Sequence, residues 1–82
     1  MKEVAYSKAA LQALRRMPAN TAVRLRSKIA DYAADPSSQA NNVKALQGTS
    51  AIRLRVGDWR IIMEDGAVLF IVQIASRGSI YS

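Results

Sequence analysis

The clearest pattern in the chain is an alternation of apolar and polar residues over positions 52–63, which read IRLRV, GD and WRIIM. Two runs with a period of two, separated by a two-residue turn, predict an antiparallel β-hairpin. In that hairpin Val56 pairs with Trp59, and Arg55 pairs with Arg60. The apolar side chains then share one face, which we expect to be the core, and the arginines share the other.

Helical and strand patterns in the rest of the chain predict an α+β layout. In the first half, apolar residues recur every three or four positions on both sides of Pro18, so we expect a helical hairpin. In the second half, Asp65 and Gly66 are typical of a type I′ turn between two strands. The expected elements are a strand at 3–6, a helix from the N-cap Ser7 to Met17, a helix from a cap at Asn20 or Thr21 to about Ala34, a loop at 35–42, a short strand at 43–46 and a strand at 68–75. They predict one α+β domain over residues 1–82: an N-terminal strand, the helical hairpin and a mainly antiparallel sheet of about three or four further strands.

The strand expected at 68–75 extends the arginine face of the hairpin. Strict alternation buries Val68, Phe70, Val72 and Ile74. The same rule places Arg77 with the hairpin arginines. It also leaves an apolar patch of Ile62, Leu69 and Ile71 beside the cations. An exposed apolar patch indicates that a partner segment covers it.

Composition narrows the chemistry of such a domain. Twelve basic and six acidic residues give a net charge of +6 and a pI of about 10.3, which favours nucleic acid, an acidic protein or a membrane surface as partner. The chain has no cysteine and no histidine, which excludes disulfides, thiolate or imidazole metal sites and histidine general bases. We expect no metal and no cofactor. Because no stretch is typical of a signal peptide or a membrane span, we expect a cytoplasmic protein without a membrane partner.

Four arginines on one sheet face are the main candidates for function. They are Arg53, Arg55, Arg60 and Arg77. Like charges opposite each other across two strands cost about 0.2–1 kcal/mol, so their retention indicates an anion such as a nucleic-acid phosphate. Guanidinium groups hold phosphate oxygens in pairs, but they stay charged and are poor general bases. The alternative is that these arginines only keep an exposed strand face soluble.

Other candidates come from an aromatic residue and three further cations. Tyr81, close to the end of the sequence, suits base stacking or hydroxyl positioning as well as packing. Trp59 follows the core alternation instead. Arg24 and Lys28 form a like-charged pair on the outward side of the second expected helix, which serves either as a solvated face or as a surface along an RNA backbone. Lys44 is the third candidate RNA-binding residue.

Several stretches, taken in order, form a pattern shared with a known group of proteins. They are YSKAAL at 6–11, RRMP at 15–18, VKALQG at 43–48, IRLRVGDWRII at 52–62 and RGSIY at 77–81. This pattern resembles the RelE branch of the RelE/ParE toxin superfamily over nearly the whole chain. The resemblance implies a two-layer RelE-like fold and the toxin of a type II toxin-antitoxin pair. It also implies a metal-independent endoribonuclease, or mRNA interferase.

Relatives cut messenger RNA in the ribosomal A site by attack of a ribose 2′-hydroxyl on the adjacent phosphate, and the resemblance assigns roles in that reaction. Arg53 and Arg55 fall where the family places basic residues that help activate the 2′-hydroxyl. Arg60 corresponds to a residue that stabilises the pentavalent phosphate, and Arg77 to one that assists the leaving 5′-oxygen. Tyr81 corresponds to a residue that stacks on or orients a base.

The resemblance also implies partners and leaves alternatives open. The implied partners are a cognate antitoxin, the ribosome and messenger RNA, and a higher-order toxin-antitoxin complex is compatible with them. Relatives carry lysine at the first two arginine positions or a glutamate-histidine pair elsewhere, whereas this chain has arginine and no histidine. The identity of the proton acceptor is therefore open, and the ribosome and the substrate are its candidate sources. A ParE-like inhibitor of DNA gyrase is one alternative function. A non-catalytic basic nucleic-acid-binding module is another.

Overall fold

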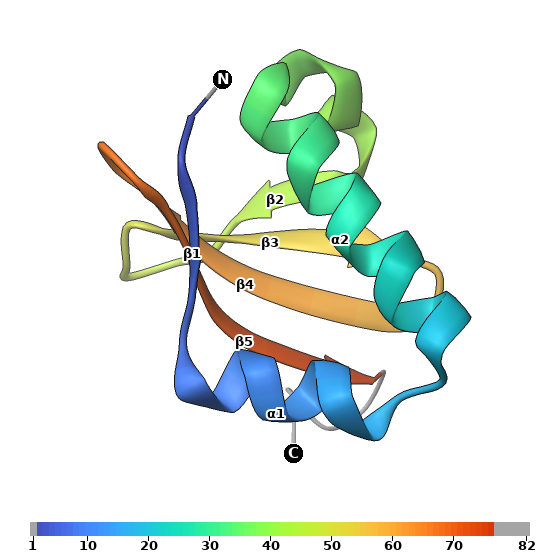
Figure 1. Cartoon of the computed structure of the whole chain (residues 1–82). Helices are drawn as coiled ribbons and strands as arrows, with labels where there is room; N and C mark the ends of the chain where they lie inside the picture. The colour runs from blue at the N-terminus through green and yellow to red at the C-terminus, as the bar shows by residue number, and fades with distance from the viewer. Residues whose placement is uncertain (1, 77–82) are drawn as a thin grey trace.

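A five-stranded sheet with two helices packed against one face makes up the structure, a computed structural model that describes residues 2–76 (Figure 1). In chain order the elements are β1 (Val4–Tyr6), α1 (Lys8–Arg16), α2 (Ala19–Ala34), the 3-10 segment η1 (Pro36–Asn42), β2 (Val43–Ala45), β3 (Ala51–Val56), β4 (Trp59–Asp65) and β5 (Leu69–Ser76). The strand order is β1-β5-β4-β3-β2, in which β1 is parallel to β5 and the other neighbours are antiparallel. The expected two-layer α+β fold is confirmed.

Ser7 caps α1 as the sequence predicts. Its Oγ accepts a hydrogen bond from the backbone N–H of Ala10 at 3.0 Å and donates one to the carbonyl of Val72 at 2.6 Å. The same hydroxyl therefore begins the helix and joins it to β5.

The start of α2 differs from the expectation. The helix begins at Ala19, with Pro18 in the N-cap position, so the expected cap at Asn20 or Thr21 is wrong. Asn20 accepts only from the adjacent N–H of Thr21, inside the first turn. A proline fits at the start because the first turn of a helix needs no backbone N–H from it.

The hairpin of β3 and β4 has the register that alternation predicts. Val56 pairs with Trp59, and Arg55 pairs with Arg60. In the turn Gly57 has a φ of +59°, a conformation that glycine adopts without a steric cost. The two-residue turn thus fixes which side chains of both strands share a face.

The connection from β4 to β5 is longer than expected. Asp65 pairs with Leu69, so residues 66–68 form the loop. Gly66 does not have the positive φ that a type I′ turn requires. The predicted type I′ turn is therefore wrong.

A β-bulge at Val72 interrupts the alternation of β5. Ile62 pairs with Gln73 and Met63 pairs with Ile71, which leaves Val72 as an extra residue between the two pairs. Because of the extra residue, side chains of β5 before the bulge face the side of the sheet opposite to the one that strict alternation predicts. Side chains after the bulge face the predicted side.

The bulge decides which apolar residues of β5 lie in the core. Leu69 and Ile71 are fully buried, whereas Phe70 is 36% exposed. The expected surface patch of Ile62, Leu69 and Ile71 is therefore wrong, as is the expected burial of Val68 and Phe70. Beyond the bulge the expected alternation holds.

The main hydrophobic core lies between the helices and the sheet. Its residues are Ala10, Leu14, Met17, Leu25, Ile29, Tyr32, Ala33, Leu54, Val56, Ile61, Met63, Leu69, Ile71 and Ile74. Trp59 packs against this core, half-buried, as its place in the alternation predicts. Because both helices lie on the core side, they leave the arginine side of the sheet uncovered.

A polar network joins the ends of α2 and β4 to the N-terminal segment. The hydroxyl of Tyr32 donates to Oδ2 of Asp65 at 2.9 Å, and Lys2 forms an ion pair with the same carboxylate. Burial of the phenol and its contact with Asp65 raise the pKa of Tyr32 to about 12. The hydrogen bond from Lys2 is the main cause that lowers the pKa of Asp65.

Candidate functional site

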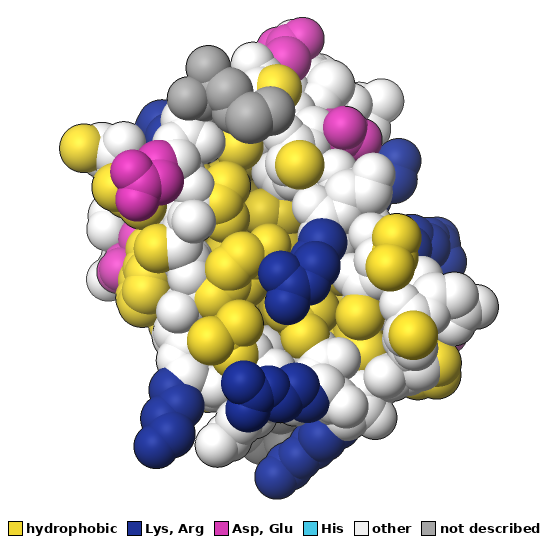
Figure 2. Space-filling model, in the orientation of Figure 1, with side chains coloured by type: hydrophobic (Ala, Val, Ile, Leu, Met, Phe, Trp, Pro, Cys, Tyr) yellow, Lys and Arg dark blue, Asp and Glu magenta, His cyan; other side chains and the backbone are white. Residues whose placement is uncertain are grey.

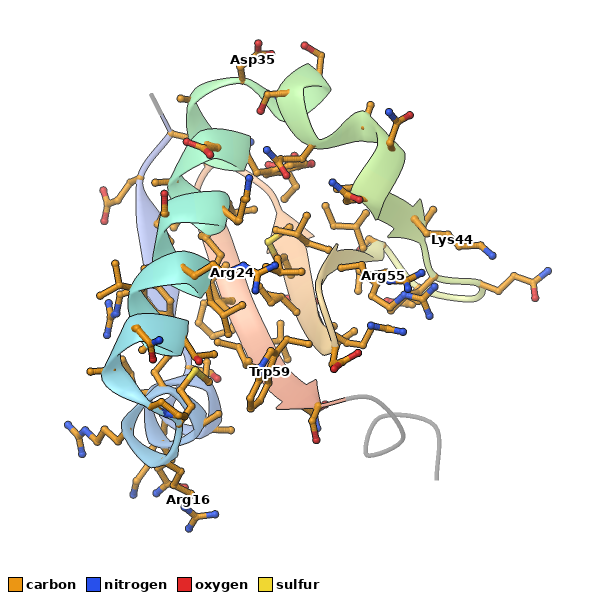
Figure 3. All side chains as sticks on the ribbon, turned by 90° about the vertical axis from the view of Figure 1, so that its right-hand side faces the viewer. Arg16, Arg24, Asp35, Lys44, Arg55 and Trp59 are labelled. Carbon is orange, nitrogen blue, oxygen red and sulfur yellow. The ribbon has the colours of Figure 1, made fainter. Side chains whose placement is uncertain are left out.

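Within residues 2–76, the side of the sheet away from the helices carries four cations on three neighbouring strands. Cross-strand pairing sets Lys44 opposite Arg53, and Arg55 opposite Arg60. We call these four residues the cationic face. Lys44 and Arg55 lie beside each other and point away from α2 (Figure 3). The hairpin register predicts the arginine positions, and β2 adds the lysine.

A cavity of about 310 Å³ opens on the cationic face. Its lining residues are Asn41, Asn42, Val43, Lys44, Arg53 and Arg55. None of them is acidic, so the cavity combines positive charge with neutral amide groups. Such a site attracts an anion that also carries hydrogen-bonding groups.

Arg60 differs from the other cations because it is buried. It is only 8% exposed, although it lies on the side of the sheet that the helices leave uncovered. Its Nη1 donates to the carbonyl of Gly57 at 3.5 Å and to that of Trp59 at 3.4 Å. These contacts hold the guanidinium at the base of the β3–β4 turn. Arg55 beside it is exposed.

Arg24 of α2 also reaches the β3–β4 turn. A Cβ added to Gly57 would lie 3.4 Å from Nη2 of Arg24, so this guanidinium rests on the glycine. Arg24 points from the helix toward the sheet, close to the hairpin end that carries Arg55 and Arg60 (Figure 3). Lys28, the other candidate cation of this helix, does not line the cavity.

The helix side of the molecule has a different surface. Hydrophobic side chains occupy much of the area between β1 and α2, with basic side chains across it and at its lower edge (Figure 2). Arg26 of α2 bridges this area, since its Cζ lies 5.1 Å from the ring centroid of Tyr6. Burial is the main cause that raises the pKa of Tyr6.

The described residues include no group of three or more acidic side chains placed to hold a metal ion. Over the same range, no helix is both long and apolar enough to cross a membrane.

Comparison with protein families adds an independent observation to this geometry. Residues 4–81 match the model of the ParE toxin of the type II toxin-antitoxin system parDE. The chain belongs to the ParE toxin family. The expected membership of the RelE/ParE superfamily is thereby confirmed. A comparison with curated protein sequences gave no significant match.

Solved structures relate this toxin to RelE. A chain of the archaeal RelE-RelB complex from Pyrococcus horikoshii is 25% identical, with a TM-score of 0.80 over 95% of this chain and 97% of that chain. The RelB-RelE antitoxin-toxin complex from Methanococcus jannaschii gives 23% identity and a TM-score of 0.76, with 95% of both chains covered. The isolated Escherichia coli RelE toxin is 16% identical, with a TM-score of 0.77 over 99% of this chain and 92% of that chain. The toxin therefore has the RelE fold.

Two of the predicted site residues, Arg77 and Tyr81, lie outside the described residues. The other predicted catalytic residues, Arg53, Arg55 and Arg60, do gather on one side of the sheet. Of the predicted RNA-binding residues, Lys44 joins them and Arg24 lies beside the turn.

Sequence reasoning missed Asn41 and Asn42, which line the cavity. The proline, serine and asparagine content of their segment predicts only a loop. One signal was available: both residues directly precede Val43, the first residue of the expected short strand. Because this strand lies at the edge of the sheet beside the arginine hairpin, the residues that precede it lie close to the same cavity.

Proposed function

We propose that this toxin is a ribosome-dependent endoribonuclease that cuts messenger RNA in the A site and thereby stops translation. The observation that supports it most is the cationic face itself. Lys44, Arg53 and Arg55 line one cavity to which residues 2–76 contribute no carboxylate, and Arg60 is held beside them at the turn. Fixed cations at one surface are what a phosphoryl-transfer transition state requires. The reaction takes place in the cytoplasm, where ribosomes translate.

The proposed reaction needs no metal. The 2′-oxygen of one ribose forms a bond to the adjacent phosphorus, and the bond from that phosphorus to the 5′-oxygen breaks. The 2′-hydroxyl loses its proton to an acceptor, and the leaving 5′-oxygen gains one. The fragments end in a 2′,3′-cyclic phosphate and a 5′-hydroxyl.

The cations act by charge and position in this reaction. Arg53 and Arg55 hold the ribose and phosphate so that the 2′-oxygen is in line for attack. Arg60, fixed by the carbonyls around its guanidinium, stabilises the charge of the pentavalent phosphate. We assign to Arg77 the role of assisting the leaving 5′-oxygen. We assign to Tyr81 the role of stacking on a base. The chain has no histidine, so the proton acceptor belongs to the ribosome or the substrate.

We further propose a cognate antitoxin as the partner that silences the toxin. The net charge of +6 favours an acidic segment. The hydrophobic area between β1 and α2, with its basic side chains, suits an amphipathic segment of that charge (Figure 2). The related structures from Pyrococcus and Methanococcus are themselves complexes of RelE with RelB.

A second candidate is inhibition of DNA gyrase. The family model matched by residues 4–81 is that of ParE from parDE systems, which favours this alternative. A protein that acts only by binding gyrase has no need for a cavity that groups three cations with two amides. The cavity therefore favours RNA cleavage.

Primer extension on a translated message tests the proposal. With ribosomes, the wild-type toxin is expected to produce discrete cuts within codons. Arg60→Ala and Arg77→Ala are expected to lower the cleavage rate by about 10²- to 10³-fold, the usual loss for one preorganised donor to a transition state. Because Arg60 is buried, circular dichroism must first establish that its variant is folded.

The matched control is Arg16→Ala, which removes an exposed arginine at the end of α1, far from Arg55 and Lys44 (Figure 3). It lowers the net charge by the same amount and should leave the cleavage rate nearly unchanged. Equal losses in all three variants would mean that only total charge matters. Inhibition of gyrase supercoiling without any cut in the message would establish the alternative function.

A further inference from the structure

The cavity on the cationic face contains groups that phosphate binding alone does not require. Lys44, Arg53 and Arg55 supply the positive charge. Asn41 and Asn42 add two neutral amides to the same lining, and both are exposed to solvent. An amide offers an N–H donor and a carbonyl acceptor side by side, which an ammonium or guanidinium does not. Adjacent donors and acceptors are what the edge of a nucleobase presents.

The amides stand on a segment whose position is fixed. At its start, Asp35 Oδ1 accepts from the backbone N–H of Ser37 at 3.2 Å and from its hydroxyl at 2.7 Å. In its middle, Gln39 is only 6% exposed and interrupts the 3-10 conformation with φ of −115° and ψ of 17°. The segment is thus anchored at its start and at the kink before it reaches Asn41. A wall held in this way loses little entropy when a ligand binds.

The pairing of β2 with β3 sets the distance between the amides and the cations. Lys44 lies directly opposite Arg53, and Asn41 and Asn42 come immediately before β2. Arg55 lines the same cavity and is itself opposite Arg60. The cavity is therefore next to the place proposed for the reacting phosphate. Its volume of about 310 Å³ is at the lower end of the range of about 300–1,000 Å³ for ligand pockets, which leaves room for one nucleotide.

We propose that this cavity binds a single ribonucleotide of the RNA beside the phosphate that is cut. Lys44 and Arg53 contact its phosphate, and the amides of Asn41 and Asn42 hydrogen-bond to its base. The amides are then specificity-determining residues, because they favour one base at that position. The inference rests on the proposed function for its place in the reaction, whereas nucleotide binding itself can be tested separately.

Nuclear magnetic resonance of the isotope-labelled toxin tests binding without any reaction. The four nucleoside 5′-monophosphates are titrated separately, with inorganic phosphate as the control anion. All five are expected to shift the Arg53 signals, because all carry phosphate. Only the nucleotides should shift the side-chain amide signals of Asn41 and Asn42, with different sizes for different bases. Identical amide shifts from inorganic phosphate and from nucleotides would overturn base recognition and leave a simple anion site.

Mapping of cut sites across many messages tests specificity. The Asn41→Ala/Asn42→Ala double variant is compared with wild type and with Asn20→Ala, an exposed asparagine of α2 that does not line the cavity. The double variant should lose base preference at one position by about 5- to 150-fold, the discrimination of one bidentate pair. Asn20→Ala should keep the wild-type preference.

The two proposals fail in different ways. If the wild-type toxin cuts no RNA, the proposed function is wrong, and the amide signals alone decide whether the cavity binds nucleotides. If it cuts RNA and the double variant keeps the wild-type base preference, the specificity role of Asn41 and Asn42 is wrong while the proposed function stands.

Discussion

Truncation of two neighbouring residues of β5 should have very different effects on stability. Ile71 is fully buried beneath the helices, whereas Phe70 is 36% exposed on the other side of the sheet. Replacing a buried isoleucine by alanine costs about 2–5 kcal/mol through lost burial and the cavity that remains. Phe70→Ala, despite its larger loss of volume, should cost about 1 kcal/mol, mainly through strand preference.

These costs are large compared with the stability of the domain. At roughly 0.05–0.15 kcal/mol per residue, the 82 residues give a free energy of unfolding of about 4–12 kcal/mol. Each kcal/mol lowers the Tm by about 4–8 °C in a domain of this size. Ile71→Ala should therefore lower the Tm by at least about 8 °C, and Phe70→Ala by less than about 8 °C.

Thermal denaturation of the isolated toxin, followed by circular dichroism, measures both variants. Val68→Ala, another exposed position next to the strand, serves as a second surface control. A larger loss for Phe70→Ala than for Ile71→Ala would refute the bulge at Val72, because it would mean that β5 alternates strictly.

Further predictions concern a turn and the polar network. Gly57→Ala should cost about 1–2 kcal/mol because of its positive φ, whereas Gly66→Ala, which lacks that conformation and has room for a methyl group, should cost much less in urea unfolding. The raised pKa of Tyr32, about 12, means that its stabilising contribution is complete below about pH 10 and is lost as the pH rises toward 12. Ultraviolet titration should find a tyrosine that ionises near pH 12 and that Tyr32→Phe removes, and an ordinary titration of all tyrosines would contradict the hydrogen bond. The lowered pKa of Asp65 means that its contribution is present above about pH 4 and is lost as the pH falls below that value. The wild-type advantage in Tm over Asp65→Asn should therefore disappear in acid, and an advantage that persists at pH 2 would contradict the ion pair with Lys2.

The sequence was sufficient for the hairpin that organises the site. A two-residue turn leaves one register for alternating strands, so the pairing of Arg55 with Arg60 followed directly. The helical hairpin also followed, because Pro18 separates two stretches of helical spacing. In both hairpins, the pattern of residues close together in the sequence is sufficient to determine the structure.

Other features depend on contacts that a local rule does not contain. The bulge at Val72 adds one residue to β5, and a run of apolar residues carries no mark of where that residue lies. The burial of Arg60 likewise depends on tertiary packing, because alternation gives the side of the sheet but not the depth.

The cavity could not be predicted from local sequence patterns either. Asn41 belongs to a segment typical of a loop, and its importance arises from the pairing of Lys44 with Arg53 across two strands. The roles of the cationic residues were expected from the resemblance to RelE, and they remain proposals. Their gathering on one side of the sheet is what makes those roles testable.

The most direct test of the proposed function is the chemistry of the RNA ends, determined by mass spectrometry after reaction with and without ribosomes. Attack by the 2′-hydroxyl predicts a 2′,3′-cyclic phosphate or 3′-phosphate on one fragment and a 5′-hydroxyl on the other. Because the ribosome supplies the geometry of the proposed reaction, little cleavage of naked RNA is expected. Efficient cutting of naked RNA, with 3′-hydroxyl and 5′-phosphate ends, would contradict both the mechanism and its dependence on the ribosome.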